Sequence, residues 1–155
     1  RKLIYLLGAK WVDFKADVCH ALATWADTPG EAGEVALKEV KDLMERKKEV
    51  PEEMIALIVK ERNQGVLPVL EVLWKASPTR WESLYGDVGQ SAEADLLRFF
   101  PQTDGMLRQS AVRLMGRVGT SESLPFLGEA DKKADAELKV LIRKASEAIH
   151  KRMNP

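Results

Sequence analysis

The chain has 155 residues, of which 45% are hydrophobic and 31% are charged, and its 24 Lys and Arg residues balance 24 Asp and Glu residues. This length and composition indicate one folded domain that buries roughly 70% of its unfolded surface, and they exclude a disordered or fibrous chain. A net charge of zero argues against general nucleic-acid binding, which requires a concentrated basic field.

Apolar residues recur with helical spacing along the whole chain, and no segment shows the alternation of a half-buried strand. Residues 1–26 fit one long helix or two helices separated at Gly8, and the turn at 27–33 contains Pro29 and two glycines. Further helices are expected at 34–48, 51–64, 66–76, 80–88, 92–100, 106–118, 122–130 and 135–153. We therefore expect a less regular helical part at residues 1–64 and three regular helical pairs at residues 65–155 of the same domain.

The second half of the chain repeats itself. Residues 81–97 and 111–127 align without a gap, and each reads as an amphipathic helix, a glycine stop and the start of a second helix. The aligned pairs include Leu84 with Leu114, Tyr85 with Met115, Val88-Gly89 with Val118-Gly119, Ser91 with Ser121 and Leu97 with Leu127. A recurring helix–turn–helix unit of about 30 residues indicates an α-solenoid.

The second helix of each pair has a narrow apolar stripe at i, i+3, i+4 and i+7. Its members are Trp81, Leu84, Tyr85 and Val88, then Ala111, Leu114, Met115 and Val118, then Leu138, Leu141, Ile142, Ala145 and Ile149. Such a stripe cannot be buried by its own pair, so neighbouring pairs are expected to stack. The small side chains of Ala111 and Ala145 should let adjacent helices approach closely.

Residues 107–127 resemble a HEAT-like repeat of the bacterial type. The matching features, in order, are Arg108, Ala111, Met115-Gly116, Val118-Gly119 and the helix start Leu124-Pro125-Phe126-Leu127. The resemblance extends over about residues 65–153, although the last helix has Ile142 where the pattern has Arg and His150 where it has Gly. It implies an all-α, right-handed α-solenoid of antiparallel helical pairs, whose most common role is to bind or scaffold another protein.

Signatures of catalysis and metal binding are missing from the sequence. His20 and His150 lie about 130 residues apart and there is no second cysteine, so a closed zinc site lacks ligands. Cys19 adjoins His20 but neighbouring helical residues point in different directions, so we expect a buried apolar cysteine and a packing histidine rather than a dyad. Glu52 and Glu53 are expected to complement a helix dipole. We expect no enzymatic activity and no cofactor.

Localisation stays open. The apolar runs are far shorter than the roughly 18 residues of a membrane span, and no signal peptide is visible. A start at Arg1 rather than methionine allows that a leader or anchor has been removed, while a single cysteine slightly favours a reducing compartment such as the cytoplasm.

Arg113, Arg117 and Lys151 are the candidate binding residues. Arg113 and Arg117 lie four residues apart, opposite the apolar stripe, where solenoids often line a concave surface. Residues 98–155 hold 11 basic against 7 acidic residues, which favours an acidic protein partner; the alternative is a solvated face. Lys151 occupies the equivalent of Arg117 and is also placed to pair with Glu147. Arg108 is expected to be structural, capping or bridging repeats.

Two other functions remain as alternatives. One is an enzyme on a helical-repeat scaffold, either a base-excision glycosylase or a chromophore lyase; the other is a nucleic-acid-binding repeat domain. A basic groove with exposed tryptophans would favour the glycosylase and nucleic-acid readings, whereas a mixed-charge face with buried tryptophans would favour a protein partner. We expect Trp11, Trp25 and Trp74 in the core and Trp81 packed between helical pairs.

Overall fold

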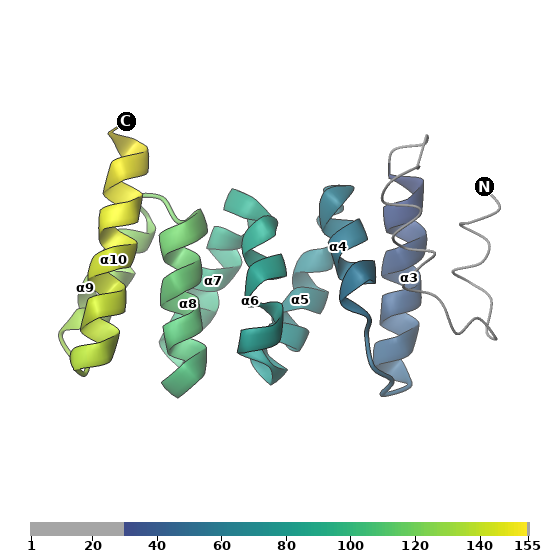
Figure 1. The fold of residues 1–155 in the computed structure, drawn as a ribbon, viewed down its shortest axis with the longest axis horizontal. Coiled ribbons are helices and arrows are strands. Elements are labelled where there is room, and N and C mark those ends of the chain that lie inside the picture. Colours follow the sequence, from purple (N-terminus) through teal and green to yellow (C-terminus); the bar gives the residue numbers. More distant parts are fainter. Residues whose placement is uncertain (1–29, 155) are drawn as a thin grey trace. The chain divides into compact units, whose positions relative to one another are not determined.

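The structure is a computed structural model that describes residues 30–154. Within this range it contains eight α-helices, two short 3₁₀ helices and no strand (Figure 1), which confirms the all-α class. The α-helices are α3 (Glu31–Glu45), α4 (Glu52–Lys60), α5 (Val66–Ala76), α6 (Pro78–Asp87), α7 (Glu93–Phe99), α8 (Gly105–Val118), α9 (Ser123–Asp131) and α10 (Ala136–Met153). The 3₁₀ helices are η1 (Gly89–Ala92) and η2 (Phe100–Gln102). Expectations for Gly8, Trp11, Cys19, His20 and Trp25 lie outside the described residues.

The helix ends follow the punctuation of the sequence. Pro51 is the extended residue before α4, and Pro78 opens α6, where its missing N–H costs no intrahelical bond. Asp135 caps α10, since its carboxylate accepts a hydrogen bond of 2.8 Å from the Leu138 amide. α4 ends at Lys60 rather than near Gly65, because Arg62 adopts a left-handed φ of 54° and turns the chain out of the helix.

The chain divides into two compact units, residues 1–70 and 71–155, so the boundary falls inside α5. In the first unit α3 packs against α4. Ala36 and Val40 of α3 and Ile55 and Ile58 of α4 are fully buried there. Their spacing along the two helices accounts for the apolar stripes in this part of the sequence.

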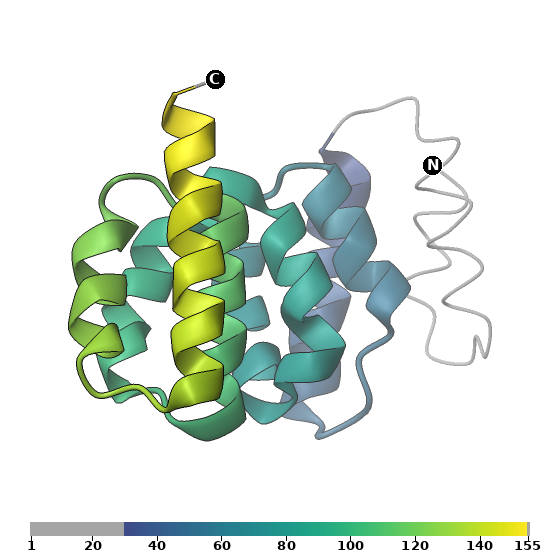
Figure 2. The same ribbon diagram turned by 60° about the vertical axis from the view of Figure 1, so that its left-hand side comes forward.

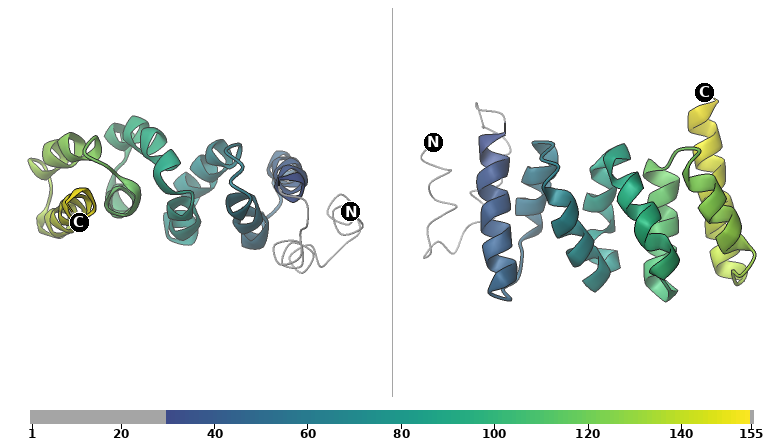
Figure 3. Two further views of the ribbon diagram at one scale, coloured as in Figure 1. Left: turned by 90° about the horizontal axis from the view of Figure 1, so that it is seen from above. Right: turned by 180° about the vertical axis from the view of Figure 1, so that it is seen from behind.

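In the second unit the second helices of the predicted pairs form one layer. α8 packs against α6 and against α10, and α7 packs against α9. Figure 2 shows α10 from the front, and the view from above in Figure 3 shows α6, α8 and α10 on one side with α7 and α9 on the other. The largest fully buried side chains here are Trp74, Tyr85, Leu96, Leu114, Met115 and Leu127. The predicted seam is therefore buried at most of its positions, and four of its residues are only half-buried: Leu84, Val88, Leu138 and Leu141.

The stacked helices are joined by specific contacts at their ends. Arg152 of α10 donates two hydrogen bonds of 2.6 Å to the carbonyls of Gly116 and Gly119 at the end of α8. A cation at this position complements the negative end of the helix dipole. Glu93 of α7 is buried, and its Oε1 accepts hydrogen bonds from the Thr120 amide (2.7 Å) and from the hydroxyl of Ser123 (2.7 Å), the first residue of α9. These contacts fix the connection between α8 and α9.

Candidate partner-binding face

Arg113 and Arg117 form the solvent-exposed strip of α8. Every other residue from position 107 to 118 is buried or half-buried, because α8 lies between α6 and α10. The two arginine side chains are 43% and 49% exposed. We use the term second-helix face for Arg113 and Arg117, for their partners Glu82 and Asp87 of α6, and for the exposed residues Glu137 and Lys151 of α10.

Arg113 makes a two-point ion pair with Glu82 on the neighbouring helix. Its Nε and Nη2 donate to the two carboxylate oxygens of Glu82 at 2.8 and 2.7 Å. This fork geometry is the strongest form of an Arg–carboxylate contact. The apolar stripe of α8 predicted that Arg113 faces solvent. The structure shows that it also joins α8 to α6 through Glu82.

Arg117 makes a second bridge to α6. Its Nη1 donates to the Ser83 carbonyl at 3.0 Å and its Nη2 contacts the Asp87 carboxylate. The side chain crosses α6 at Gly86, where an added Cβ would lie 2.7 Å from Nη1 and 2.8 Å from Cδ. A side chain at position 86 would therefore displace the arginine from its present path to the end of α6.

The electrostatics of the face reflect these bridges. Burial alone would raise the pKa of Glu82, but hydrogen bonds from Arg113 and Ser110 and the charges of Arg113 and Arg117 together lower it. The pKa of Arg113 is raised by its hydrogen bond to Glu82, with a further contribution from the charge of Glu137. Acidic and basic groups thus alternate from α6 through α8 to α10.

A shallow hollow lies between α6 and α8 on this face. Its volume is about 450 Å³, and it is lined by Thr79, Glu82, Ser83, Arg113, Leu114 and Arg117. Lys151 is exposed in the last turn of α10. Glu147 forms an ion pair with Arg143, at 3.8 Å, although its spacing also allows a pair with Lys151. The structure thus brings Arg113 and Arg117 together around one hollow, whereas Lys151 lies outside its lining, on the helix that packs against α8.

The described tryptophans are buried, as expected. Trp74 has no exposed surface and Trp81 is 3% exposed. The Trp74 ring stacks on Tyr85 with centroids 5.4 Å apart, and its Nε1 donates to the buried Ser110 hydroxyl at 2.8 Å. Burial raises the pKa of Tyr85, and the nearby charges of Asp95 and Glu71 raise it further. These rings stabilise the core of the second unit and do not reach the surface.

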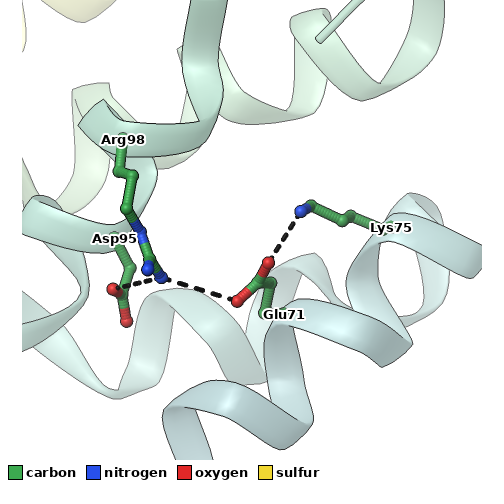
Figure 4. Close-up of polar contacts among 4 residues, drawn as sticks. All are labelled: Glu71, Lys75, Asp95 and Arg98. Carbon is green, nitrogen blue, oxygen red and sulfur yellow. Dashed lines mark hydrogen bonds and ion pairs between the residues drawn. The ribbon is translucent and has the colours of Figure 1, made fainter. Parts of the chain in front are cut away.

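Sequence reasoning missed a four-residue ion network between α5 and α7 (Figure 4). Glu71 accepts from Lys75 at 2.7 Å and contacts Arg98 at 3.6 Å, and Arg98 also contacts Asp95 at 3.0 Å. Lys75 and Arg98 both lie over the Phe99 ring. The i,i+4 and i,i+3 pairs could have been recognised from spacing. The Glu71–Arg98 contact depends on how the two helices pack.

Groups that could bind a metal are absent from residues 30–154, since no three His, Cys, Asp or Glu side chains converge there. The described histidine, His150, has its Nδ1 2.8 Å from the Ser146 carbonyl of its own helix. Within the same range, no helix combines the length and apolar character needed to cross a membrane.

Arg108 lies over the Phe100 ring and makes long contacts of 3.5 Å to Thr103 and to the Pro101 carbonyl.

Comparison of the chain with family models, with curated proteins and with solved structures found no match.

Proposed function

We propose that this chain is a right-handed α-solenoid of HEAT-like helical pairs and that it is a binding module or scaffold for another protein, without catalytic activity. Two features support the solenoid. The sequence repeats with a period of about 30 residues, and in the second unit the second helices α6, α8 and α10 pack side by side. This is the arrangement that repeating amphipathic pairs produce when each pair covers the apolar stripe of the next.

The observation that carries the functional proposal is that the arginines of the second-helix face are paired with carboxylates while the described tryptophans are buried. Arg113 and Arg117 face Glu82 and Asp87, so the face is mixed in charge rather than uniformly basic. A face of mixed charge with a hollow suits binding to a complementary protein surface, where charged groups determine orientation and partner choice. Trp74 is not available to stack on an inserted base.

The arginines retain donors for an acidic partner. A guanidinium has five N–H donors, and Arg113 directs only its Nε and one terminal nitrogen at Glu82. A partner carboxylate can therefore extend the existing network at Arg113 and Arg117 without displacing Glu82 or Asp87. Lys151 adds a third cation on α10. We expect the surface of the partner to present carboxylates interspersed with basic groups.

The two alternatives receive less support. Nucleic-acid binding requires several unmatched cations along a groove, and the arginines of this face are already paired with carboxylates. A helical-repeat glycosylase requires accessible aromatic side chains around a base, and Trp81 is buried. A lyase for a chromophore would need an enclosed pocket, whereas the hollow on this face is shallow and polar.

The test is partner capture with a face variant. The whole chain and the variant R113Q/R117Q/K151Q are immobilised, and proteins from nuclease-treated extract of the cells that produce the chain are quantified by mass spectrometry. We expect a small set of proteins to be retained by the unaltered chain and lost with the variant. Glutamine is used because it removes charge without placing a carboxylate against Glu82.

The matched control is K38Q/K41Q/K48Q, which removes the same charge from exposed lysines in the first unit. It should retain the same proteins as the unaltered chain. Equal retention by all three forms would refute a role for the second-helix face. A parallel capture from untreated extract is also made, and proteins retained there but not from the nuclease-treated extract would instead favour the nucleic-acid alternative.

A further inference from the structure

A second hollow lies on the other side of the second unit, away from the second-helix face. It is formed between η2 and α9, with α8 at its edge, and has a volume of about 450 Å³. Its walls are mostly apolar and come from Phe100, Pro101, Pro125, Phe126 and Ala130. Volumes in this range are typical of binding pockets.

The rim of this hollow has an excess of positive charge. Arg108 and Lys133 line it together with a single carboxylate, Glu129. Glu129 is already engaged, because Lys132 donates a hydrogen bond to it, and this contact lowers the pKa of the Glu129 carboxyl. The charge of Lys133 also acts on Glu129, so one carboxylate faces three cations and the rim keeps a net positive charge.

Arg108 is held in place by weak contacts. Its guanidinium carbon lies 5.6 Å from the centre of the Phe100 ring, and its hydrogen-bond contacts to Thr103 and Pro101 are both 3.5 Å long. Contacts of this length contribute little compared with a charge-assisted bond of 2.7–2.9 Å to a carboxylate. A ligand carboxylate would thus give Arg108 a stronger partner than it has within the described chain.

We propose that this hollow, the Phe100–Phe126 hollow, binds an acidic segment of a partner protein. A large apolar side chain of the segment enters between the two phenylalanines and the flanking carboxylates contact Arg108 and Lys133. A peptide is favoured over a small molecule because the site is open: Pro101, Pro125, Glu129 and Lys133 are all exposed. Small-molecule pockets bury most of their ligand, whereas an extended peptide needs only its anchor side chain buried.

This proposal does not depend on the proposed function of the second-helix face. The two sites share no lining residue, and the variants that test one leave the other intact. Loss of partner capture in R113Q/R117Q/K151Q would therefore say nothing about the Phe100–Phe126 hollow.

The experiment selects binders from a random twelve-residue peptide library displayed on phage, using the whole chain as bait. We expect enriched peptides to contain one or two large apolar residues flanked by Asp or Glu. The strongest peptide is then synthesised with a fluorescent label and its affinity measured by polarisation. Ala130→Trp should fill the hollow and weaken binding at least about tenfold, and Lys133→Glu should weaken it about fivefold.

Lys133→Glu guards against a folding artefact, because Lys133 is exposed in the turn after α9 and its side chain supports no helix. Lys144→Glu, on the exposed side of α10, is the matched charge control and should leave affinity unchanged. Enrichment of peptides without acidic residues would overturn the proposal. Binding of the peptide by Lys133→Glu and Ala130→Trp with the same affinity as by the unaltered chain would overturn it as well. If no peptide is enriched and the chain binds decanoate instead, the proposal fails and the hollow is reassigned to a small amphipathic acid.

Discussion

Gly116 of α8 lies directly against Ala145 of α10: a Cβ added to Gly116 would be 2.9 Å from the Ala145 Cα and 3.0 Å from its Cβ. The two stacked helices therefore meet at a point where Gly116 cannot carry a side chain without moving the backbone at Ala145. The small side chain of Ala145 predicts a close approach of the two helices. The structure shows that the facing residue is a glycine.

Gly116→Ala should destabilise the second unit by about 1–3 kcal/mol, the usual cost of overpacking, because the added methyl group meets backbone rather than a flexible side chain. Gly128→Ala is the matched control. Gly128 also lies inside a helix, but nothing lies within 4 Å of its added Cβ. The control should gain about 0.5–1 kcal/mol from helix propensity. Urea unfolding measures both, and equal effects of the two substitutions would refute the close contact.

Trp81→Ala should lower the free energy of unfolding by about 3–5 kcal/mol, the range for truncating a buried large aromatic. Trp81 is 3% exposed and begins the apolar stripe of α6. Denaturant unfolding followed by circular dichroism gives the value. A loss below about 1 kcal/mol would mean that the ring is accessible in solution, and a stacking role for Trp81 would then regain support.

Helix positions were predictable where proline and glycine mark the ends. The range 66–76 was expected and α5 spans Val66–Ala76. The end of α4 was placed too late because Gly65 seemed to be the stop signal, whereas Arg62 takes the left-handed conformation first. Side-chain propensity gives no indication of this, since arginine rarely adopts a positive φ.

The candidate site was predictable in part. The exposed side of α8 followed from the position of its apolar stripe, and the structure finds Arg113 and Arg117 there. Their pairing with α6 was missed, although the 30-residue offset aligns Arg113 with Ser83 and so brings Glu82 near it once the second helices stack. The Phe100–Phe126 hollow could not be foreseen, because it joins residues of η2 and α9 through the packing of loops and helix starts.

Glu93→Ala should destabilise the connection between α8 and α9 by about 1–3 kcal/mol, because it leaves the Thr120 amide and the buried Ser123 hydroxyl without their acceptor. Glu93→Gln retains an amide oxygen in nearly the same place and should lose less. Amide hydrogen exchange at Thr120, together with urea unfolding, provides the measurement. If alanine and glutamine were equally tolerated, the Glu93 contacts would contribute nothing to the fold.

Stability should depend on pH through Glu82. Its folded-state pKa is lowered from the reference value of 4.5, since the hydrogen bonds and charges of Arg113, Ser110 and Arg117 outweigh the opposing effect of burial. A lowered folded-state pKa gives stability that is fully present above the unfolded-state pKa and is lost as the pH falls through the folded-state value. Glu82→Gln should thus be less stable than the unaltered chain at pH 7, and the difference should shrink as the pH falls below about 4.5.

Urea unfolding at intervals from pH 7 to pH 3 tests this. Glu129→Gln is the control, because the pKa of Glu129 is also lowered but its pair with Lys132 is largely exposed. Screening by solvent and salt should make its contribution small at every pH. If the difference between Glu82→Gln and the unaltered chain stayed constant down to pH 3, the Arg113–Glu82 bridge would not be stabilising α6 against α8.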